Sequence, residues 1–384
     1  MLSIPKTDKA RASQIVKWYA MRMGFDLVGI TSADPFLGDE KVAIDRLNEG
    51  LMDGLPWFHE ERIRRGTRPK EILLGARSII SLAMSYLSEG IPEKPKPLAG
   101  RVARYAMGKD YHGVMEKRLK SFVKGLSEHI GSDIKAKVYV DTGPMLDRAV
   151  AERSGIGWYG KNTNILTSSH GSWVFLGQVI TDLDLHPDEQ SKKTCGDCTL
   201  CIDQCPTGAI VSPYVLDNKR CISYLTIECR GPIPRELRPL MGDWVFGCDI
   251  CQDVCPVNRK AASTSEPAFQ VGEHGFSSLD LIPLLRITDK EFLEKFTGTP
   301  IRRAKRIGLV RNVCIALGNI GDRAAVPALL EVLVNTEPLL RGHSAWALGR
   351  IGGEEAKTGL NRAIDLETDI WAAEEMQLAI EELS

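Results

Sequence analysis

Cysteine is the residue type whose spacing in this chain points most specifically to chemistry. Nine of the ten cysteines lie between Cys195 and Cys255, and only Cys314 lies outside that segment. Four of the nine form one run that ends in proline, Cys195-x2-Cys198-x2-Cys201-x3-Cys205-Pro206. Runs with this spacing bind [4Fe–4S] clusters in bacterial two-cluster proteins, where three thiolates hold one cubane and the fourth serves the other. The run therefore predicts a pair of iron–sulfur clusters.

The rest of the ligands for such a pair come from a shorter run, Cys248-x2-Cys251-x3-Cys255-Pro256. This run lacks one cysteine, which either Cys221 or Cys229 can supply. Crossed ligation then gives two sets of four thiolates. The first set is Cys195, Cys198, Cys201 and Cys255, and the second is Cys205, Cys248 and Cys251 with Cys221 or Cys229. Zinc also binds paired C-x2-C motifs, but it explains neither four cysteines in one run nor two runs that end in Cys-Pro.

A glycine-rich segment over residues 155–160 fits the pattern G-x-G-x-x-G. The dinucleotide-binding form of that pattern follows a strand and opens a helix, whereas a helix is expected before these glycines. Together with Lys161 and Asn162 the segment nearly fits a P-loop, but Asn162 stands where Ser or Thr should hold magnesium. Neither nucleotide site is therefore predicted, and the segment is interpreted as a loop that lets a ligand approach the backbone.

Asp141 begins an Asp-Thr-Gly triplet of the kind found in aspartic proteases. Protease chemistry needs two such carboxylates that share a proton, and the chain has no second triplet. Asp141 is well placed to cap a helix expected over 145–154. It also stands at the carboxyl end of an expected strand, which is a common position for site residues. The residues alone favour the helix cap over a catalytic role, and they leave the second interpretation open.

A second near-match begins at Asp110, where Asp110-Tyr111-His112-Gly113 resembles the cobalamin signature D-x-H-x-x-G. The glycine of that signature is missing, because position 115 is Met. A histidine that replaces the base of cobalamin is therefore not supported, and His112 is interpreted as an ordinary surface or core histidine.

The composition is that of a soluble globular protein with more than one domain. The 384 residues are 43% apolar and 26% charged, with a formal net charge of -1. These values exclude a disordered chain, a collagen-like chain and a wholly basic nucleic-acid binder. The N-terminal residues have no apolar core of signal-peptide length, and the apolar stretch 72–87 is interrupted by Arg77 and too short to span a bilayer. We therefore expect a cytoplasmic protein without membrane contact, whose thiols stay reduced and free for metal.

The elements that must position these residues are helices mixed with short strands. Helices are predicted over 8–24 and 145–154, and strands over 25–30, 72–87, 136–140 and 173–181. This mixture indicates an α+β domain over residues 1–185, although the strand order does not follow from the sequence. A ferredoxin-like domain is then expected over 186–262, followed by a connecting segment over 263–300.

The C-terminal residues 301–384 carry an internal repeat. Residues 316–321 (ALGNIG) recur 31 residues later as 347–352 (ALGRIG), and a second helical stretch follows each copy, over 325–333 and 354–364. Helix pairs of this length are typical of HEAT-like α-solenoids. Two units are fewer than a free-standing solenoid needs, so we expect them to pack against the rest of the protein. A basic run at their entrance is either a solvated helix face or a phosphate contact; it contains Arg302, Arg303, Lys305 and Arg306.

Several stretches together resemble one family, the epoxyqueuosine reductases, which are cobalamin-dependent enzymes of tRNA queuosine synthesis. The stretches that carry the resemblance are Ala103-Arg104-Tyr105-Ala106, Asp110-Tyr111-His112, Val140-Asp141-Thr142-Gly143-Pro144, Gly157-Trp158-Tyr159-Gly160-Lys161-Asn162-Thr163, Gly171-Ser172-Trp173, Cys221-Ile222-Ser223-Tyr224-Leu225-Thr226-Ile227-Glu228 and Gly247-Cys248-Asp249-Ile250-Cys251-Gln252-Asp253-Val254-Cys255-Pro256. Each stretch is weak alone, and the combination is specific. It covers roughly residues 8–300, and the repeats match the longer family members.

The resemblance implies a fold and a reaction. The N-terminal domain would bind cobalamin in a fold shared with reductive dehalogenases, and the two clusters would deliver electrons to the cobalt. The substrate would be a tRNA with epoxyqueuosine at the wobble position, which two electrons and protonation of the leaving oxygen convert to queuosine and water. An external low-potential electron donor is then required. Nothing in the sequence indicates an obligate dimer, so we expect a monomer.

The resemblance also implies roles for individual residues. Asp141 matches the family's proton donor, and such an acid is needed because expelling an unprotonated alkoxide is costly at neutral pH. Cys221 is favoured over Cys229 as the remaining ligand of the second cluster, and Arg230 becomes a candidate tRNA contact. The residues implied as cobalamin neighbours are Arg64, Arg104, Asp141, Lys161, Ser223 and Asp249.

Two other classes of function remain as alternatives. A two-cluster electron-transfer module with no catalysis of its own is disfavoured by the large N-terminal domain and by the segment around Asp141. A cobalamin-dependent reductive dehalogenase is disfavoured by the lack of an export signal and by repeats with a basic edge.

Overall fold

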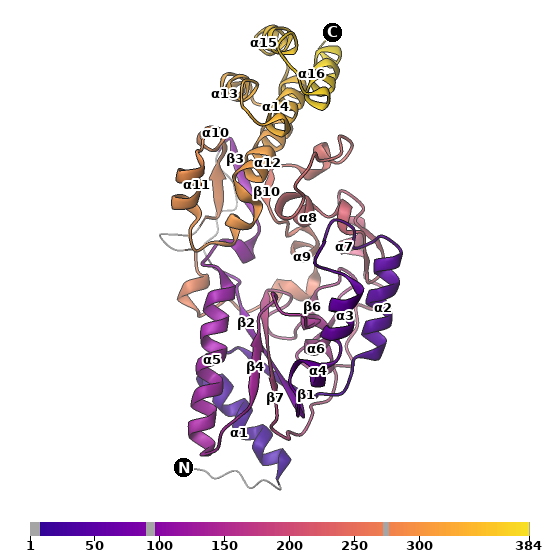
Figure 1. Ribbon diagram of the computed structural model, residues 1–384, viewed down its shortest axis with the longest axis vertical. Helices are drawn as coiled ribbons and strands as arrows, with labels where there is room; N and C mark the ends of the chain where they lie inside the picture. The colour runs from indigo at the N-terminus through magenta and orange to yellow at the C-terminus, as the bar shows by residue number, and fades with distance from the viewer. Residues whose placement is uncertain (1–7, 90–96, 272–275, 384) are drawn as a thin grey trace.

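The computed structural model describes residues 8–89, 97–271 and 276–383. Its elements fall into three regions along one long axis (Figure 1): a sheet with covering helices at one end, the cysteine segment beside it, and a stack of helices at the other end. None of the described helices is long and apolar enough to cross a membrane.

The main sheet has four strands in the order β1-β2-β7-β4, and every neighbouring pair is antiparallel. Its strands are β1 (Leu27–Ser32), β2 (Ser78–Ser85), β7 (Val174–Thr181) and β4 (Ala136–Tyr139). Alternate residues of a strand point to opposite faces. Ile80 of β2 therefore packs with α1 (Lys9–Arg22) and α5 (Tyr111–Ile130), and Ile79 packs with α6 (Asp147–Arg153) on the other face. Both faces are thus covered, which explains why β2 is buried along its whole length.

These elements largely agree with those expected from the sequence, and the stretch 72–87 is the main exception. Its first residue ends a short helix, α4 (Pro69–Ile72), and the strand begins only at Ser78. A proline in the first helical turn starts α4, and Gly75 turns the chain with a φ of 84° before the strand. Because the strand is shorter than expected, Arg77 lies just before it and ion-pairs with Asp184.

Short elements and turns build the cysteine segment. Helix α7 (Leu200–Asp203) lies within the first run and contacts α9 (Ile250–Asp253), which lies within the second. Helix α8 (Ile222–Ile227) starts directly after Cys221. A small sheet ties this segment to the N-terminal part, because β3 (Ala99–Val102) lies between β10 (Trp244–Phe246) and β11 (Ser278–Asp280). The remaining α-helices and strands described before the repeats come from three segments. Those of the N-terminal part are α2 (Leu37–Asn48), α3 (Glu60–Gly66), β5 (Trp158–Tyr159) and β6 (Ile165–Leu166); those of the cysteine segment are β8 (Ile210–Ser212) and β9 (Val215–Leu216); and those of the connecting segment are α10 (Leu281–Leu285) and α11 (Asp289–Phe296).

The C-terminal helices form two stacked repeat units. They are α12 (Lys305–Ile320), α13 (Val326–Val332), α14 (Pro338–Ile351), α15 (Glu354–Ile364) and α16 (Ile370–Glu382). Gly318 lets α12 approach α14 closely, since a Cβ there would lie 2.9 Å from the Cα of Ala347. The expected packing against the rest of the protein is confirmed, because Val313 and Leu317 of α12 share one hydrophobic core with Leu225 and Phe246.

Candidate active site

A central cavity of about 1380 Å³ lies where the N-terminal domain, the cysteine segment and the entrance to the repeats meet. Asp141 reaches its wall from the loop after β4, and Tyr111 and His112 reach it from the first turn of α5. The cysteine segment contributes four thiols to the same wall: Cys205, Cys221, Cys248 and Cys251. A single space is therefore lined by titratable groups and by candidate cluster ligands.

Asp141 is held in a strained and exposed position. Its φ is 57°, in the left-handed region that an aspartate adopts at some cost. Its side chain is 67% exposed. The Tyr111 hydroxyl donates to Asp141 Oδ2 at 2.7 Å, and His112 Nε2 lies 3.5 Å from the same oxygen. Interaction with His112, followed by the bond from Tyr111, outweighs the partial loss of hydration caused by the surrounding wall and lowers the pKa of Asp141 to about 2.

The helix-cap interpretation of Asp141 is wrong. The N-cap position of α6 is Leu146, and no side chain caps that helix end. The backbone turn at Asp141 instead aims its carboxylate at the start of α5. The site interpretation is the one that this geometry supports.

His112 is not an ordinary surface or core histidine, because it lies between two carboxylates. Its Nδ1 lies 2.7 Å from Asp110 Oδ1, and its Nε2 faces Asp141. Asp110 is also the N-cap of α5, where it accepts a bond from the His112 backbone N–H. Burial disfavours the charged ring, but the two carboxylates outweigh it and raise the pKa of His112 to about 9. At neutral pH the proton of this group therefore resides on His112, and Asp141 is ionised.

A further carboxyl, Asp147, lines the cavity and was not singled out from the sequence. Burial and the negative charge of Asp141 raise the pKa of Asp147 to about 7. Its Oδ1 is buried without a hydrogen-bond partner, as is Oε1 of Gln178. It lies in the first turn of α6, where an acidic residue is common because of the helix dipole, so its residue type and position carry no signal of a site. Only the tertiary structure shows that it faces a cavity.

The cysteines lie in two neighbourhoods, and all ten are free thiols. The pKa of Cys201 is raised to about 11, mainly by burial and then by the charges of Cys195, Cys255 and Cys198. Burial and the charges of Cys221 and Cys205 likewise raise the pKa of the Cys248 thiol. Among the described residues, no three or more His, Cys, Asp or Glu side chains lie close enough together to bind one metal ion. The neighbours of Cys201 are the other three members of the first predicted set, and Cys248 lies among members of the second.

Cys229, the alternative to Cys221, occupies a different environment. Its Sγ donates to Gly231 O at 3.6 Å, and its carbonyl accepts a bond from the buried guanidinium of Arg311. Cys221 lies on the cavity wall, and Cys229 does not line it. The geometry therefore favours Cys221 as the remaining ligand of the second set.

The other predicted cofactor neighbours divide into wall residues and residues behind the wall. Ser223 and Asp249 line the cavity. Asp249 is buried and accepts the Arg104 backbone N–H at 2.7 Å, and its pKa is raised to about 6 by burial, against the effect of Arg104. The Arg104 guanidinium lies 4.7 Å above the Trp173 ring. Lys161 Nζ donates to Gly196 O, inside the first cysteine run, at 2.7 Å.

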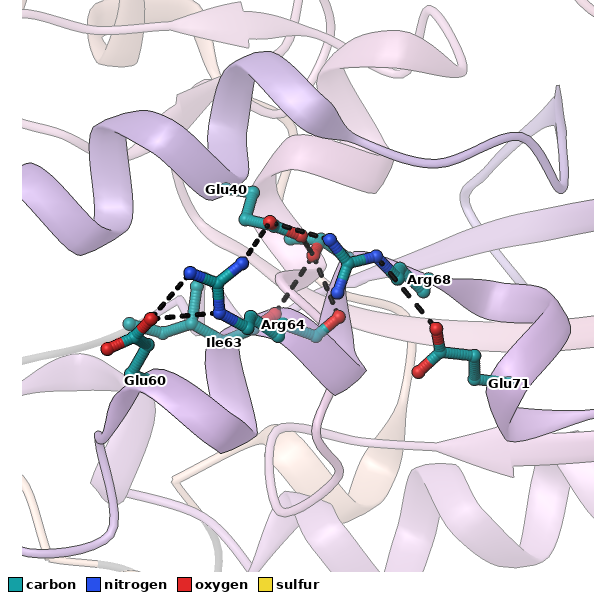
Figure 2. A network of polar contacts seen from close by, with 7 residues as sticks. Glu40, Glu60, Ile63, Arg64, Arg68 and Glu71 are labelled. Atoms are coloured by element: carbon teal, nitrogen blue, oxygen red, sulfur yellow. Dashed lines mark hydrogen bonds and ion pairs between the residues drawn. The ribbon is translucent and has the colours of Figure 1, made fainter.

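Arg64 is not among the residues that line the cavity. Figure 2 shows its guanidinium between two carboxylates, with Nη2 2.5 Å from Glu60 and Nη1 3.3 Å from Glu40. Arg68 binds the same Glu40 oxygen at 2.8 Å, so Arg64 belongs to an ion-pair network that joins α2 to α3.

The basic run is split by the structure. Arg302 and Arg303 line the cavity, whereas Lys305 and Arg306 do not. Arg303 binds Glu228 at 2.8 Å, and its guanidinium lies 5.0 Å above the ring of Trp57, another wall residue that sequence reasoning missed. Arg230 donates to the carbonyls of Ala304 and Arg303 at 3.0 and 2.9 Å, so its guanidinium holds the entrance of the repeats in place.

Three family models match separate parts of the chain. One, described as epoxyqueuosine reductase QueG, DUF1730, matches residues 66–142. A 4Fe-4S double cluster binding domain matches residues 194–258, and HEAT repeats match 306–381. The first confirms the family resemblance, the second the presence of a double-cluster domain and the third the HEAT-like repeats.

Relatives match the chain over most of its length. The epoxyqueuosine reductase of Escherichia coli is 38% identical over 348 residues, which cover 89% of this chain and 90% of that protein. That of Bacillus anthracis is 37% identical and covers 98% of this chain and 99% of its own.

Solved structures agree. An epoxyqueuosine reductase with an epoxyqueuosine-modified tRNA-Tyr stem loop is 36% identical, with a TM-score of 0.91 over 97% of this chain and 99% of that one. The Bacillus subtilis enzyme, known with an aspartate-bearing catalytic loop swung out of its active site, is 34% identical, with a TM-score of 0.90 over 97% and 99%. Sequence, domain order and fold therefore agree that the chain belongs to the epoxyqueuosine reductase family.

Proposed function

We propose that this chain reduces epoxyqueuosine in the anticodon of a tRNA to queuosine. The observation that carries the proposal is the central cavity, whose wall holds both the Asp141–His112 pair and the second set of thiols. A proton source and an electron source that face one space are what the reductive opening of an epoxide needs. The modified stem loop bound to a relative supports the same substrate class.

The reaction balances with two electrons and two protons. The carbon–oxygen bonds of the epoxide break, a carbon–carbon double bond forms, and the oxygen leaves as water. The electrons enter through the two [4Fe–4S] clusters, with Cys195, Cys198, Cys201 and Cys255 as ligands of one and Cys205, Cys221, Cys248 and Cys251 as ligands of the other. The second cluster is the one that would pass electrons into the cavity, because its thiols line the wall.

We propose cobalamin as the group that fills the cavity, where it supplies a strongly reducing metal centre. The volume of about 1380 Å³ suits a large cofactor, and the wall combines apolar rings with polar groups. Ser223 and Asp249 would contact the group directly. Arg104 would orient Asp249, and Lys161 would hold the loop of the first cysteine run. Arg64 would act only at a distance, through α3.

Asp141 and His112 share the task of protonating the leaving oxygen. The proton rests on His112 Nε2 at neutral pH; Asp141 Oδ2 lies 3.5 Å from that nitrogen, and both residues line the cavity. A substrate that covers the exposed Asp141 side chain removes water from it, which raises the pKa of the carboxyl toward protonation. Asp141 then takes the proton from His112 and passes it to the oxygen as the carbon–oxygen bond breaks.

Part of the cavity wall suits a nucleic acid. Arg302 and Arg303 supply positive charge for phosphate, and the Trp57 ring offers a face on which an unstacked base can lie. Lys305 and Arg306 continue the basic run into the first repeat helix, where Arg306 also pairs with Asp289 at 2.8 Å, and Arg230 keeps this edge in place through the backbone. We further propose that the enzyme works as a monomer in the cytoplasm, where its thiols stay reduced, with an external low-potential electron donor.

One experiment tests the whole proposal. The protein is reconstituted anaerobically with iron, sulfide and cobalamin, and its optical spectrum is recorded for bound corrinoid. It is then reduced and given tRNA that carries epoxyqueuosine, and the nucleosides are measured by mass spectrometry. We expect epoxyqueuosine to fall and queuosine to rise one for one. Persistence of epoxyqueuosine with fully loaded, reduced protein contradicts the proposal.

A further inference from the structure

The outer end of the proposed electron path is open to solvent. Cys198, in the first cysteine set, is the exposed thiol among the ten. Three large apolar side chains near it are also exposed: Leu200 by 39%, Val211 by 51% and Tyr214 by 37%. The second set, in contrast, lines the cavity. The first cluster is thus the one that a donor from solution reaches.

These residues form one continuous surface. Helix α7, which begins at Leu200, contacts β8, which carries Val211. The Tyr214 backbone N–H donates to Lys161 O at 3.0 Å, and Lys161 Nζ donates to Gly196 O at 2.7 Å. Cys195 is one of the groups that raise the pKa of Tyr214, after burial. We call residues 192–203, 211–214 and 256–260, with Lys161, the carrier face.

The carrier face is basic. Its cations are Lys161, Lys192, Lys193, Arg259 and Lys260, and its carboxylates are Asp197 and Asp203. Residues 168–169 connect the segments 192–203 and 256–260 of this face. Lys193 Nζ donates to Ser168 Oγ, and the Ser169 carbonyl accepts the N–H of Ala262, two residues after Lys260. Lys192, Arg259 and Lys260 are exposed. An apolar centre with a charged rim is the composition of a protein-docking surface.

We propose that the carrier face docks a small acidic protein that carries one electron at a time. The inference rests on the proposed function, whose electron donor it identifies by chemical class. Each encounter moves one electron from the reduced carrier to the first cluster, so the carrier is oxidised and the cluster reduced by one unit. Two encounters supply the two electrons that one epoxide consumes.

A protein carrier fits this surface better than a nucleic acid does. Leu200 and Val211 are exposed on this face and offer apolar contact, whereas contacts to a phosphate backbone are polar. Redox partners bury small interfaces and dissociate quickly, and a basic rim around an acidic partner raises the association rate more than the affinity. RNA contact at this face is therefore an outcome that the test must separate.

The test uses the reconstituted protein without tRNA. A reduced acidic [2Fe–2S] ferredoxin is mixed with it, and cluster reduction is followed by rapid-freeze EPR, whose temperature dependence separates the two cluster types. The test variant combines Lys192→Glu, Arg259→Glu and Lys260→Glu. The control variant makes the same change in net charge at exposed sites elsewhere, with Lys41→Glu, Lys124→Glu and Lys290→Glu.

We expect the second-order rate constant of the test variant to fall at least about tenfold at low salt, because steering is lost. The control keeps the wild-type value, and high salt narrows the difference. Photoreduced deazariboflavin, a small neutral reductant, should reduce all three proteins equally. Equal ferredoxin rates for test and control variants overturn the proposal. So does a wild-type protein that deazariboflavin reduces but ferredoxin does not. A test variant that ferredoxin reduces at the wild-type rate, but that binds tRNA more weakly than the control in a separate titration, overturns it as well. Queuosine formation driven by deazariboflavin checks the proposed function independently.

Discussion

Two regions of the molecule gather ionisable groups and differ in how these groups are bonded. We call Asp141, His112 and Asp147 the cavity corner, and we call Arg238, Arg311, His343 and Glu375, where the repeats meet the cysteine segment, the junction. At the junction, Arg238 is 1% exposed and binds both carboxylate oxygens of Glu375, at 2.6 and 2.8 Å. The buried Arg311 donates to the carbonyls of Leu225, Cys229 and Gly231. At the cavity corner, Asp141 is exposed and strained, and Asp147 Oδ1 has no partner.

The difference teaches how to tell structural from functional ionisable groups in this molecule. Buried groups whose donors are all used hold elements together. Burial lowers the pKa of His343 at the junction well below its ordinary value, so this ring stays neutral and accepts the Ile233 N–H. At the corner, neighbouring groups have pKa values pushed apart, near 2, 7 and 9, with capacity left for a ligand. Such a spread is typical of acid–base sites.

The two candidate cysteines belong one to each region, and replacing them gives the largest expected contrast. Cys221→Ser removes a thiolate from the cavity wall, so we expect loss of one [4Fe–4S] cluster, about half of the iron and all tRNA turnover. Cys229→Ser lies beside Arg311 and should keep both clusters. Iron and sulfide analysis with EPR spin quantitation measures the outcome. Loss of a cluster from the Cys229 variant, with Cys221→Ser intact, would reverse the assignment.

Asp141→Asn should lower turnover by about 10² to 10⁴-fold, the range that general acid catalysis contributes. The amide cannot carry the proton from His112 to the leaving oxygen, although it keeps the shape of the loop. Cluster content, corrinoid binding and melting temperature should not change. Asp45→Asn, an exposed site on α2, is the matched control. Single-turnover conversion of epoxyqueuosine gives the rate, and unchanged turnover in Asp141→Asn would mean that another group is the acid.

The double-cluster domain, the repeats and most strands could be predicted from the sequence because these depend on local spacing. Four ligands in one run, a 31-residue period and alternating apolar residues can all be read along the chain. The sheet order could not be read, because it depends on contacts between segments as distant along the chain as β2 and β7. For the same reason His112 looked ordinary. Its signature was incomplete, and its partner Asp141 lies 29 residues later, across a turn whose positive φ no pattern announces.

Arginines were the least predictable residues. The family resemblance implied that Arg64 is a cobalamin neighbour and that Arg230 is a tRNA contact, and no role was expected for Arg311. The structure binds Arg64 to Glu60, Arg230 to backbone carbonyls and Arg311 inside the core. A guanidinium reaches far and has five donors, so its partner is set by the tertiary structure and not by its neighbours in the chain.

Breaking the junction should cost stability and leave the chemistry intact. Glu375→Leu leaves the buried Arg238 without its carboxylate, and removing one partner of a buried pair costs about 3–5 kcal/mol. We expect the repeats to unfold at lower urea concentration, while cluster content is retained. The double variant Arg238→Met with Glu375→Leu should recover much of the loss, because no buried charge remains. Urea titration by circular dichroism measures both, and equal losses in the single and double variants would argue against a charge effect.

The pH dependence of turnover gives the smallest effect and separates His112 from Asp141. His112 holds its proton below its pKa of about 9, so single-turnover rates should stay level near neutrality and fall roughly tenfold per unit above pH 9. His112→Gln should remove this alkaline limb.

Folding raises the pKa of His112 above its ordinary value of 6.5, so its contribution to stability is complete below pH 6.5 and is lost as pH rises through 9. The melting temperature of the wild type should therefore fall across that window more than that of His112→Gln. If the single-turnover rate of His112→Gln still falls above pH 9, the titrating group is Asp147 or belongs to the cofactor. His112 would then not be one of the functional ionisable groups that distinguish the cavity corner from the junction.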